Sequence, residues 1–423
     1  MIKKTVFIIA TFLLAQTCLA QDENIFLSRA YWKEKPTLEK VKIDIAEGHN
    51  PSELDRYDFD AIGWAILEDT DDEIIRFLLT QEGNGVNKLT HDGRTYIFWA
   101  AYKNKLALMK FLLEKGARTD IIDSHGYSLV NFCAVTGQLN TAIYDLCIQQ
   151  GSKLSEEFNN DGANPLLLLS SFIENEQQIT YFTNKGLNLN TTDREGNNAF
   201  VYAAKSGNMF MMKYLLELDM DPRANNDAAF FYAAKGMRRK PNKLPLYKYL
   251  ESLGLDINAK NKDDQNLLHH LLKSNKDTLL ISYLIENGVS LNHKDHQGMS
   301  PLTVAVQRKN FPALALCEKY QADFSVKDIE GASLLHRAVQ HEDWDLMKIL
   351  LKYDIDINAK NNDGMTALHL AAMSGENINF IDSLLSVGAD KRIRTEFGEN
   401  AYELAMENEL MNKNTKDLKI LIP

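Results

Sequence analysis

The chain has 423 residues, of which 45% are hydrophobic and 25% are charged, a balance typical of a folded globular protein rather than a disordered one. Its formal net charge is −11 at pH 7, so nucleic acid, itself a polyanion, is not an expected partner. The composition therefore favours a protein with a sizeable buried core.

Residues 1–20 have the pattern of a secretory signal peptide. Lysines near the N-terminus precede an apolar run from Val6 to Leu14, and Ala20 ends the segment with a small residue at the usual cleavage position. Because the run is about ten residues and a spanning helix needs about twenty, we predict cleavage rather than anchoring. We expect no membrane insertion after signal cleavage and a periplasmic or secreted mature chain, residues 21–423.

Three cysteines follow this segment, Cys133, Cys147 and Cys317. In an oxidising compartment Cys133 and Cys147 could form a disulfide. Each also fits as a small apolar residue on the buried side of a helix. We favour the second interpretation, because sequence spacing does not supply the geometry that a disulfide requires.

A glycine recurs along the chain with a period of about 33 residues. We call these positions the marker positions; the glycines are Gly93, Gly126, Gly162, Gly196, Gly298, Gly331, Gly364 and Gly398. Asp227 and Asp264 fall near the two missing marks. The regular period predicts an array of equivalent structural units rather than a single mixed core.

The string NNDGMTALHLAAMSG, residues 361–375, shows one unit most clearly. Its Asp-Gly pair indicates a tight turn, and Thr366 can cap the helix that follows. Leu368, Ala371 and Ala372 then share one helical face. A second apolar stretch ends at Gly388, which is typical of a second short helix with a glycine C-cap.

These units resemble the ankyrin repeat family, whose unit is about 33 residues long and carries a Thr-Pro-Leu-His signature. The resemblance covers nearly all of residues 21–423. It implies an all-α ankyrin-repeat helical solenoid of about twelve helix-turn-helix units with short finger turns. We expect a divergent N-terminal cap unit at about 25–56, an irregular unit with an insertion at about 227–261, and a truncated C-terminal cap at about 396–423. Since the units use up the chain, we expect no enzymatic activity, no catalytic residues and no cofactor.

Three histidines, His269, His336 and His369, occupy the same place in their units. Packed helices lie about 8–10 Å apart, too far for equivalent side chains to share one zinc ion. We expect these histidines to tie one unit to the next by hydrogen bonds, as the signature histidine of ankyrin repeats does. His293 and His296 lie on one finger without an evident third ligand, so we predict no metal site.

One cation recurs on each of several successive fingers. It forms either a basic ladder for an acidic partner or a set of solvated tips that neighbouring aspartates neutralise. With three further residues of these fingers, these cations make up our candidate partner-binding set: Lys260, His293, Lys294, His296, Lys327, Lys360, Arg392 and Arg394.

The irregular unit has an insertion, Gly236 to Pro245, between its two helices. Basic residues gather in and around it without an acidic residue between Asp227 and Glu251. They could bind an anionic group of a partner, or form a solvated loop. We also expect a hinge here; the basic residues are Lys235, Arg238, Arg239, Lys240, Lys243 and Lys248.

The sequence favours an exported, non-enzymatic protein-binding scaffold, expected to be a monomer. Its protein partner would dock across the concave face formed by first helices and finger turns. The alternative is a secreted effector or immunity-type protein that binds a foreign or toxic partner. The identity of the partner does not follow from a fold.

Overall fold

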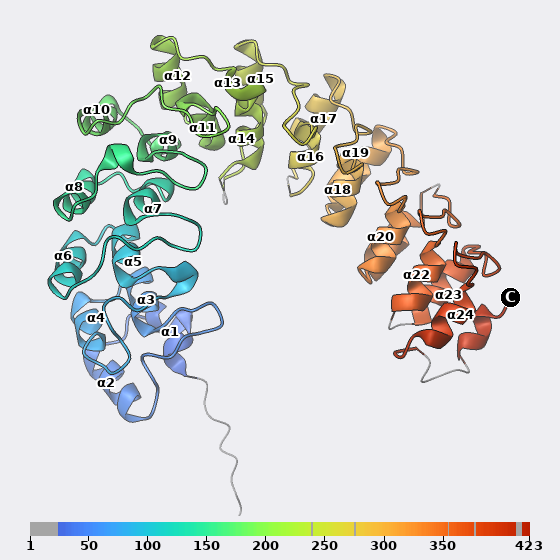
Figure 1. Ribbon diagram of the computed structural model, residues 1–423, viewed down its shortest axis with the longest axis horizontal. Helices are drawn as coiled ribbons and strands as arrows, with labels where there is room; N and C mark the ends of the chain where they lie inside the picture. The colour runs from blue at the N-terminus through green and yellow to red at the C-terminus, as the bar shows by residue number, and fades with distance from the viewer. Residues whose placement is uncertain (1–23, 238–239, 275, 354, 376–377, 412–416) are drawn as a thin grey trace, which may run out of the picture. The chain divides into compact units, whose positions relative to one another are not determined.

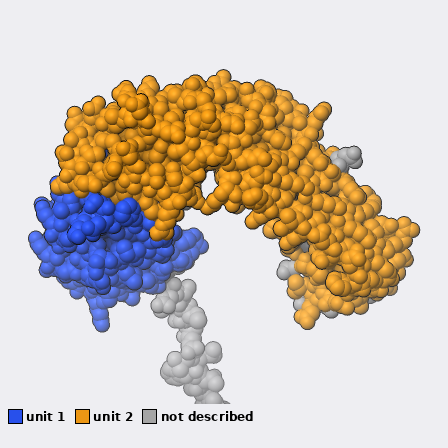
Figure 2. Space-filling model, turned by 45° about the horizontal axis from the view of Figure 1, so that its top comes forward, with its two compact units in different colours: residues 1–160 blue, residues 161–423 orange. Residues whose placement is uncertain are grey.

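The computed structural model describes residues 24–423 apart from 238–239, 275, 354, 376–377 and 412–416. The predicted signal peptide therefore lies outside the described residues, as do Arg238 and Arg239. The chain forms two compact units, residues 1–160 and 161–423, which Figure 2 draws in blue and orange. We call them unit 1 and unit 2.

Short α-helices in consecutive pairs build both units, and the described residues contain isolated bridges but no strand. Unit 1 contains η1 (Ile25–Leu27), α1 (Arg29–Lys33), α2 (Leu38–Ala46), α3 (Ala61–Leu67), α4 (Asp72–Leu78), η2 (His91–Gly93), α5 (Tyr96–Tyr102), α6 (Leu106–Glu114), α7 (Leu129–Val135), α8 (Thr141–Gln149) and η3 (Leu154–Glu156). Unit 2 contains α9 (Pro165–Leu169), α10 (Glu176–Asn184), α11 (Ala199–Ser206), α12 (Met209–Glu217), α13 (Ala224–Asp227), α14 (Ala229–Lys235), α15 (Leu244–Ser252), α16 (Leu267–Leu271), α17 (Thr278–Glu286), α18 (Pro301–Gln307), α19 (Phe311–Lys319), α20 (Leu334–Gln340), α21 (Trp344–Leu350), α22 (Ala367–Ser374), α23 (Ile378–Ser386), α24 (Ala401–Glu407) and η5 (Asp417–Leu421).

Within each unit the first helix of one pair packs on the first helix of the next pair. In unit 1, α3, α5 and α7 form one row and α4, α6 and α8 form the other (Figure 1). In unit 2, α11, α14, α16, α18, α20, α22 and α24 contact one another in order, and α15, α17 and α19 do the same in the second row. The predicted all-helical solenoid of about twelve helix-turn-helix units is confirmed.

The apolar stripes of the sequence become the buried contacts between helices. Leu368, Ala371 and Ala372 are at most 1% exposed, and on the second helix of that unit Ile381 and Leu384 are fully buried. Each helix is only about two turns long and would be marginal alone in water. Packing on the neighbouring pairs therefore supplies most of its stability.

The turns use left-handed backbone at the marker positions, as the spacing of glycines predicts. Gly364 has φ of 72°, and Asp264 reaches the same region with φ of 59°. Asp219 and Gln321 stand where other units have a glycine C-cap, and they have φ of 56° and 55°. Residues other than glycine adopt left-handed backbone at a cost in conformational free energy. The packing of the array, rather than the preference of these residues, therefore stabilises these turns.

The irregular unit lies inside unit 2, since the two compact units divide at residues 160 and 161. Its finger turn has no glycine, and three consecutive residues, Asn225, Asn226 and Asp227, take positive φ values. The insertion falls between α14 and α15, as the sequence indicates. A hinge at this insertion stays a prediction.

Candidate functional site

The three aligned histidines are structural ties between neighbouring units. Nε2 of His269 donates to the carbonyl oxygen of Met299 at 2.9 Å, and Nε2 of His336 donates to that of Met365 at the same distance. His369 makes the equivalent bond at 3.0 Å to Ile393. The predicted role of these side chains is confirmed.

The other ring nitrogen of each histidine closes a capping box at the start of its helix. In α20, Nδ1 of His336 accepts the backbone N–H of Ser333 at 3.2 Å, while the Ser333 hydroxyl caps the helix. Burial lowers the pKa of His336, and it does the same for His269 and His369. These rings are therefore neutral and fully engaged in packing at neutral pH.

The finger lysines form a regular series of hydrogen bonds, in which each side chain donates to a backbone carbonyl of the next finger. Nζ of Lys294 donates to the carbonyl oxygen of Lys327 at 2.9 Å, and Nζ of Lys327 donates to that of Lys360 at 2.9 Å. Lys360 continues the series to the carbonyl of Arg394 at 3.0 Å. Each of these ammonium groups joins its finger to the next one while its side chain stays exposed.

Most of the remaining members of the candidate partner-binding set have partners on their own finger, on the preceding finger or on the helix that follows. Lys260 pairs with Asp264 at 3.2 Å, and His293 also contacts Asp264, with 2.7 Å between Nε2 and the backbone carbonyl. Arg392 pairs with Asp390 and Arg394 with Glu403, at 2.9 and 3.1 Å. His296 is exposed. The fingers thus bring the set into one ridge, and its role in binding stays a prediction.

No cluster of three His, Cys, Asp or Glu side chains suited to a metal ion is found among the residues that the structure describes. Cys133, Cys147 and Cys317 are buried free thiols. Burial raises the pKa of Cys133 well above its ordinary value and that of Cys147 and Cys317 to about 12. The cysteines therefore act as small apolar side chains in the core.

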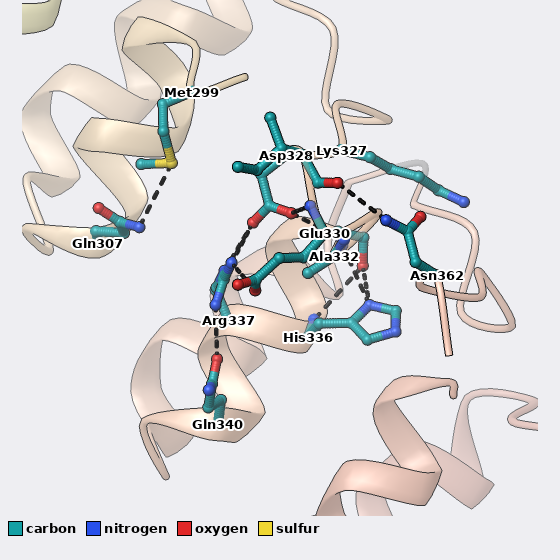
Figure 3. Close-up of polar contacts among 12 residues, drawn as sticks. Met299, Gln307, Lys327, Asp328, Glu330, Ala332, His336, Arg337, Gln340 and Asn362 are labelled. Atoms are coloured by element: carbon teal, nitrogen blue, oxygen red, sulfur yellow. Dashed lines mark hydrogen bonds and ion pairs between the residues drawn. The ribbon is translucent and has the colours of Figure 1, made fainter. Parts of the chain in front are cut away.

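The first helices present a variable position directly after the signature position, and in α20 this residue is Arg337. Figure 3 shows its guanidinium with Asp328 and Glu330 on one side and Gln340 on the other. Nε lies 2.8 Å from Asp328 and Nη2 lies 2.7 Å from Glu330. The positive charge of Arg337 is thus neutralised by two carboxylates of the finger that precedes α20.

A different arrangement occurs where α14 and α16 adjoin. A hollow of about 800 Å³ lies there, with Phe231, Tyr232 and His270 among its lining residues. Its basic lining residues are Lys235, Lys260, Lys262 and Lys273. Two of these have acidic partners: Lys260 pairs with Asp264, and Lys262 with Glu195.

The described residues of the insertion that suggested an anion site do not line this hollow. Lys235 lines it, whereas Lys243 pairs with Asp277 at 3.3 Å and Lys248 lies over the ring of Tyr283 at 4.9 Å. Sequence reasoning missed Lys273, because Lys235 lies eight residues after its marker Asp227 whereas Lys273 lies nine residues after Asp264. Aligning the helix starts instead of the marker positions places both lysines at the same point.

Unit 1 carries an apolar ridge that the sequence analysis also missed. Four residues before each marker position, where several fingers of unit 2 have a lysine, unit 1 has Leu89, Ile122 and Phe158, which are 58%, 57% and 50% exposed. Leu54 is 39% exposed and stands four residues before Asp58, whose φ of 61° matches the other markers. We call Leu54, Leu89, Ile122 and Phe158 the apolar finger ridge.

Hydrogen bonds hold the fingers of this ridge against one another. Nδ1 of His91 lies 2.7 Å from the carbonyl of Tyr57, and the N–H of Ser124 donates to the carbonyl of Asp92 at 2.8 Å. The apolar side chains therefore line up along adjacent turns instead of being scattered singly. Exposed apolar side chains on successive fingers make the ridge a candidate interaction surface.

A family model described as ankyrin repeats (3 copies) matches residues 62–157, 166–261, 230–328 and 313–395, more than half of the chain. The chain belongs to the ankyrin repeat family. Among the described residues, no helix is both long and apolar enough to cross a membrane.

Individual proteins of bacteria also resemble this chain. A putative ankyrin repeat protein of Rickettsia felis is 24% identical over 59% of this chain and 54% of its own length. The phosphocholine transferase AnkX of Legionella pneumophila is 23% identical over 53% of this chain but 21% of its own length. A putative ankyrin repeat protein of Rickettsia bellii is 32% identical over 20% of this chain and 46% of its own length. The chain thus spans about half the length, or less, of these relatives.

Proposed function

We propose that this protein is an exported, non-enzymatic ankyrin-repeat scaffold that holds a protein partner on its finger turns and first helices. Membership of the ankyrin repeat family supports the binding role. The observation that carries the proposal is the apolar finger ridge, because exposed leucine, isoleucine and phenylalanine at equivalent turns have no structural reason to be apolar. Export rests on the signal pattern of residues 1–20.

The ridge is suited to a protein partner rather than to a small molecule. Its side chains are spread over successive fingers and do not converge on a closed cavity, so a ligand must be long enough to touch several turns at once. A binding site for a small molecule is instead concave and buries most of its ligand. The ridge would form the apolar centre of such an interface, surrounded by the polar residues of the fingers.

Affinity capture with the mature chain as bait tests the binding role. The first variant replaces Leu89, Ile122 and Phe158 with Ser, and capture of any saturable partner from envelope extract should fall about tenfold or more. The matched control replaces Ile43, Leu218 and Leu279 with Ser. These residues are 53%, 52% and 73% exposed but lie on second helices or, for Leu218, at the C-cap of one. Equal capture by both variants would contradict a role for the ridge.

Cell fractionation tests the export part of the proposal separately. We expect the intact mass of the exported protein to match a chain that starts at Gln21. A partner captured from the envelope supports a periplasmic scaffold, whereas release of the protein into the medium supports the secreted effector or immunity-type alternative. A protein that keeps residues 1–20 and stays in the cytoplasm would contradict export.

A further inference from the structure

Three consecutive units of unit 2 place a lysine at the same point of the first helix, three residues after the variable position. They are Lys205 at the end of α11, Lys235 at the end of α14 and Lys273 just after α16. Since α11 packs on α14 and α14 packs on α16, the three lysines follow one another on helices whose axes lie about 8–10 Å apart. We call them the lysine row.

The neighbouring units on either side have uncharged residues at this point, so the row is a local feature. The following units have Gln307, Gln340 and Met373 there, and the preceding one has Ser171. Burial, and then the charge of Lys235, lower the pKa of Lys205, in agreement with the closeness of these two members of the row. Neighbouring ammonium groups repel each other in the protein without a ligand, and a bound anion reduces this repulsion.

No carboxylate of the described residues forms an ion pair with Lys205, Lys235 or Lys273. The nearby acids have other partners: Asp193 accepts the hydroxyl of Tyr202 at 2.9 Å, and Glu195 pairs with Lys262. This contrasts with Arg337, whose charge two carboxylates neutralise (Figure 3). The lysine row is therefore a cationic strip without carboxylate partners beside the hollow between α14 and α16, and within it Nζ of Lys235 lies 5.6 Å from the ring centre of Tyr232.

The surroundings of the strip decide which anion fits. The whole chain has a net charge of −11, so a membrane surface or a nucleic acid would meet repulsion from the acidic remainder of the molecule. A narrow, extended protein segment can contact the strip alone. Because an extended segment in the polyproline II conformation has three residues per turn and rises about 3.1 Å per residue, acidic side chains three residues apart lie on one face about 9 Å apart, which matches the distance between neighbouring helices.

We propose that the lysine row binds an extended acidic segment of a protein partner, with a carboxylate at every third residue and uncharged side chains over the hollow. Tyr232 and Phe231 line this hollow and offer ring surface to those uncharged side chains. The site is separate from the apolar finger ridge and stands without the proposed function.

Fluorescence anisotropy with a synthetic peptide tests the site on the mature chain. The probe has about twelve residues, with Glu at every third position and Ser or Gly elsewhere, and binding is measured at about 50 mM salt, where screening is modest. We expect saturable binding that weakens steeply as salt increases. The variant Lys205→Gln, Lys235→Gln, Lys273→Gln should bind at least tenfold more weakly.

A matched variant and two further ligands make the result specific. Lys213→Gln, Lys248→Gln and Lys276→Gln remove the same charge from second helices and loops of the same region and should change affinity less than twofold. A peptide of the same composition with its Glu residues consecutive should bind several-fold more weakly. Equal loss in both triple variants, no preference for spaced Glu, or binding of tripolyphosphate but not of the peptide would overturn the proposal. Circular dichroism confirms that each variant is folded.

Discussion

A single residue that departs from the repeat pattern can lower the stability of the folded chain, and Asn131 is such a residue. Asn131 takes the place of the signature histidine in α7, and its side chain is fully buried with both polar atoms lacking a hydrogen-bond partner in the described part of the structure. The next unit has Leu167 at this place, buried and apolar. The histidine tie of other units is therefore absent here, and the amide group is buried without compensation.

Replacing Asn131 with Leu should stabilise the protein by about 1–3 kcal/mol, because the unsatisfied amide is removed and the shape is nearly kept. Urea denaturation followed by circular dichroism measures the change. Asn140→Leu is the control and should destabilise the protein by about 1 kcal/mol, because Asn140 caps α8. A destabilised Asn131→Leu variant would show that the amide has a partner in solution.

The buried histidines predict a loss of stability in mild acid. Burial, and next the charge of Lys273, lower the pKa of His270 to about 4, whereas a histidine in an unfolded chain titrates near pH 6.5. Between these values the unfolded chain binds a proton that the folded chain does not, so stability is complete above about pH 6.5 and falls as the pH decreases toward 4. For His270 the loss amounts to at most about 3 kcal/mol.

The variant His270→Leu should flatten this pH dependence, since Leu occupies the equivalent position in α22 as Leu370. Thermal unfolding between pH 7.5 and pH 4.5 measures it. His296→Gln, an exposed position, should leave the slope of the wild type unchanged. If the slope of His270→Leu equals that of the wild type, His270 does not contribute to the acid sensitivity.

At the scale of elements, the fingers are held together by side chains that the sequence suggested for binding. The regular spacing of the finger cations was visible in the sequence, but not the direction of their ammonium groups. Lysine is long enough to reach either a partner or the next turn, and only the backbone geometry shows that Lys294, Lys327 and Lys360 reach a carbonyl. Any binding role of these residues is therefore combined with a structural one.

Replacing Lys327 with Met keeps the length of the side chain and removes its bond to the carbonyl of Lys360. Because the site is exposed, we expect a loss of about 0.5–1.5 kcal/mol in the free energy of unfolding. Urea denaturation measures it, with Lys352→Met as the control at an exposed lysine of the same region. Equal stability of Lys327→Met and the wild type would show that water replaces the bond without cost.

At the scale of the whole molecule, the sequence predicted the all-helical array from its period, its helix starts and its glycine turns. It could do so because one local rule, repeated every 33 residues or so, specifies both the helices and their neighbours. The lysine row was not predicted, because Lys235 lies eight residues after its marker position, whereas Lys205 and Lys273 lie nine residues after theirs. The apolar finger ridge was missed because exposure at a turn depends on backbone geometry and not on residue type.

An array of this kind should lose stability locally when one unit is damaged. Leu284 on α17 is fully buried, and Leu284→Ala should cost about 2–5 kcal/mol. Since α17 contacts α15 and α19, hydrogen exchange should accelerate in these helices while α5 to α8 in unit 1 keep their protection. Uniform acceleration throughout the chain would instead show that both units unfold as one cooperative block.

The finger position that is apolar in unit 1 and cationic in much of unit 2 has a practical consequence for purification and assay. Contacts made by leucine, isoleucine and phenylalanine persist or strengthen in concentrated sulfate, whereas contacts made by lysine fade as ionic strength rises. A salt gradient should therefore release ligands of the two ridges in separate fractions. The order of elution alone would report which part of the chain had held each of them.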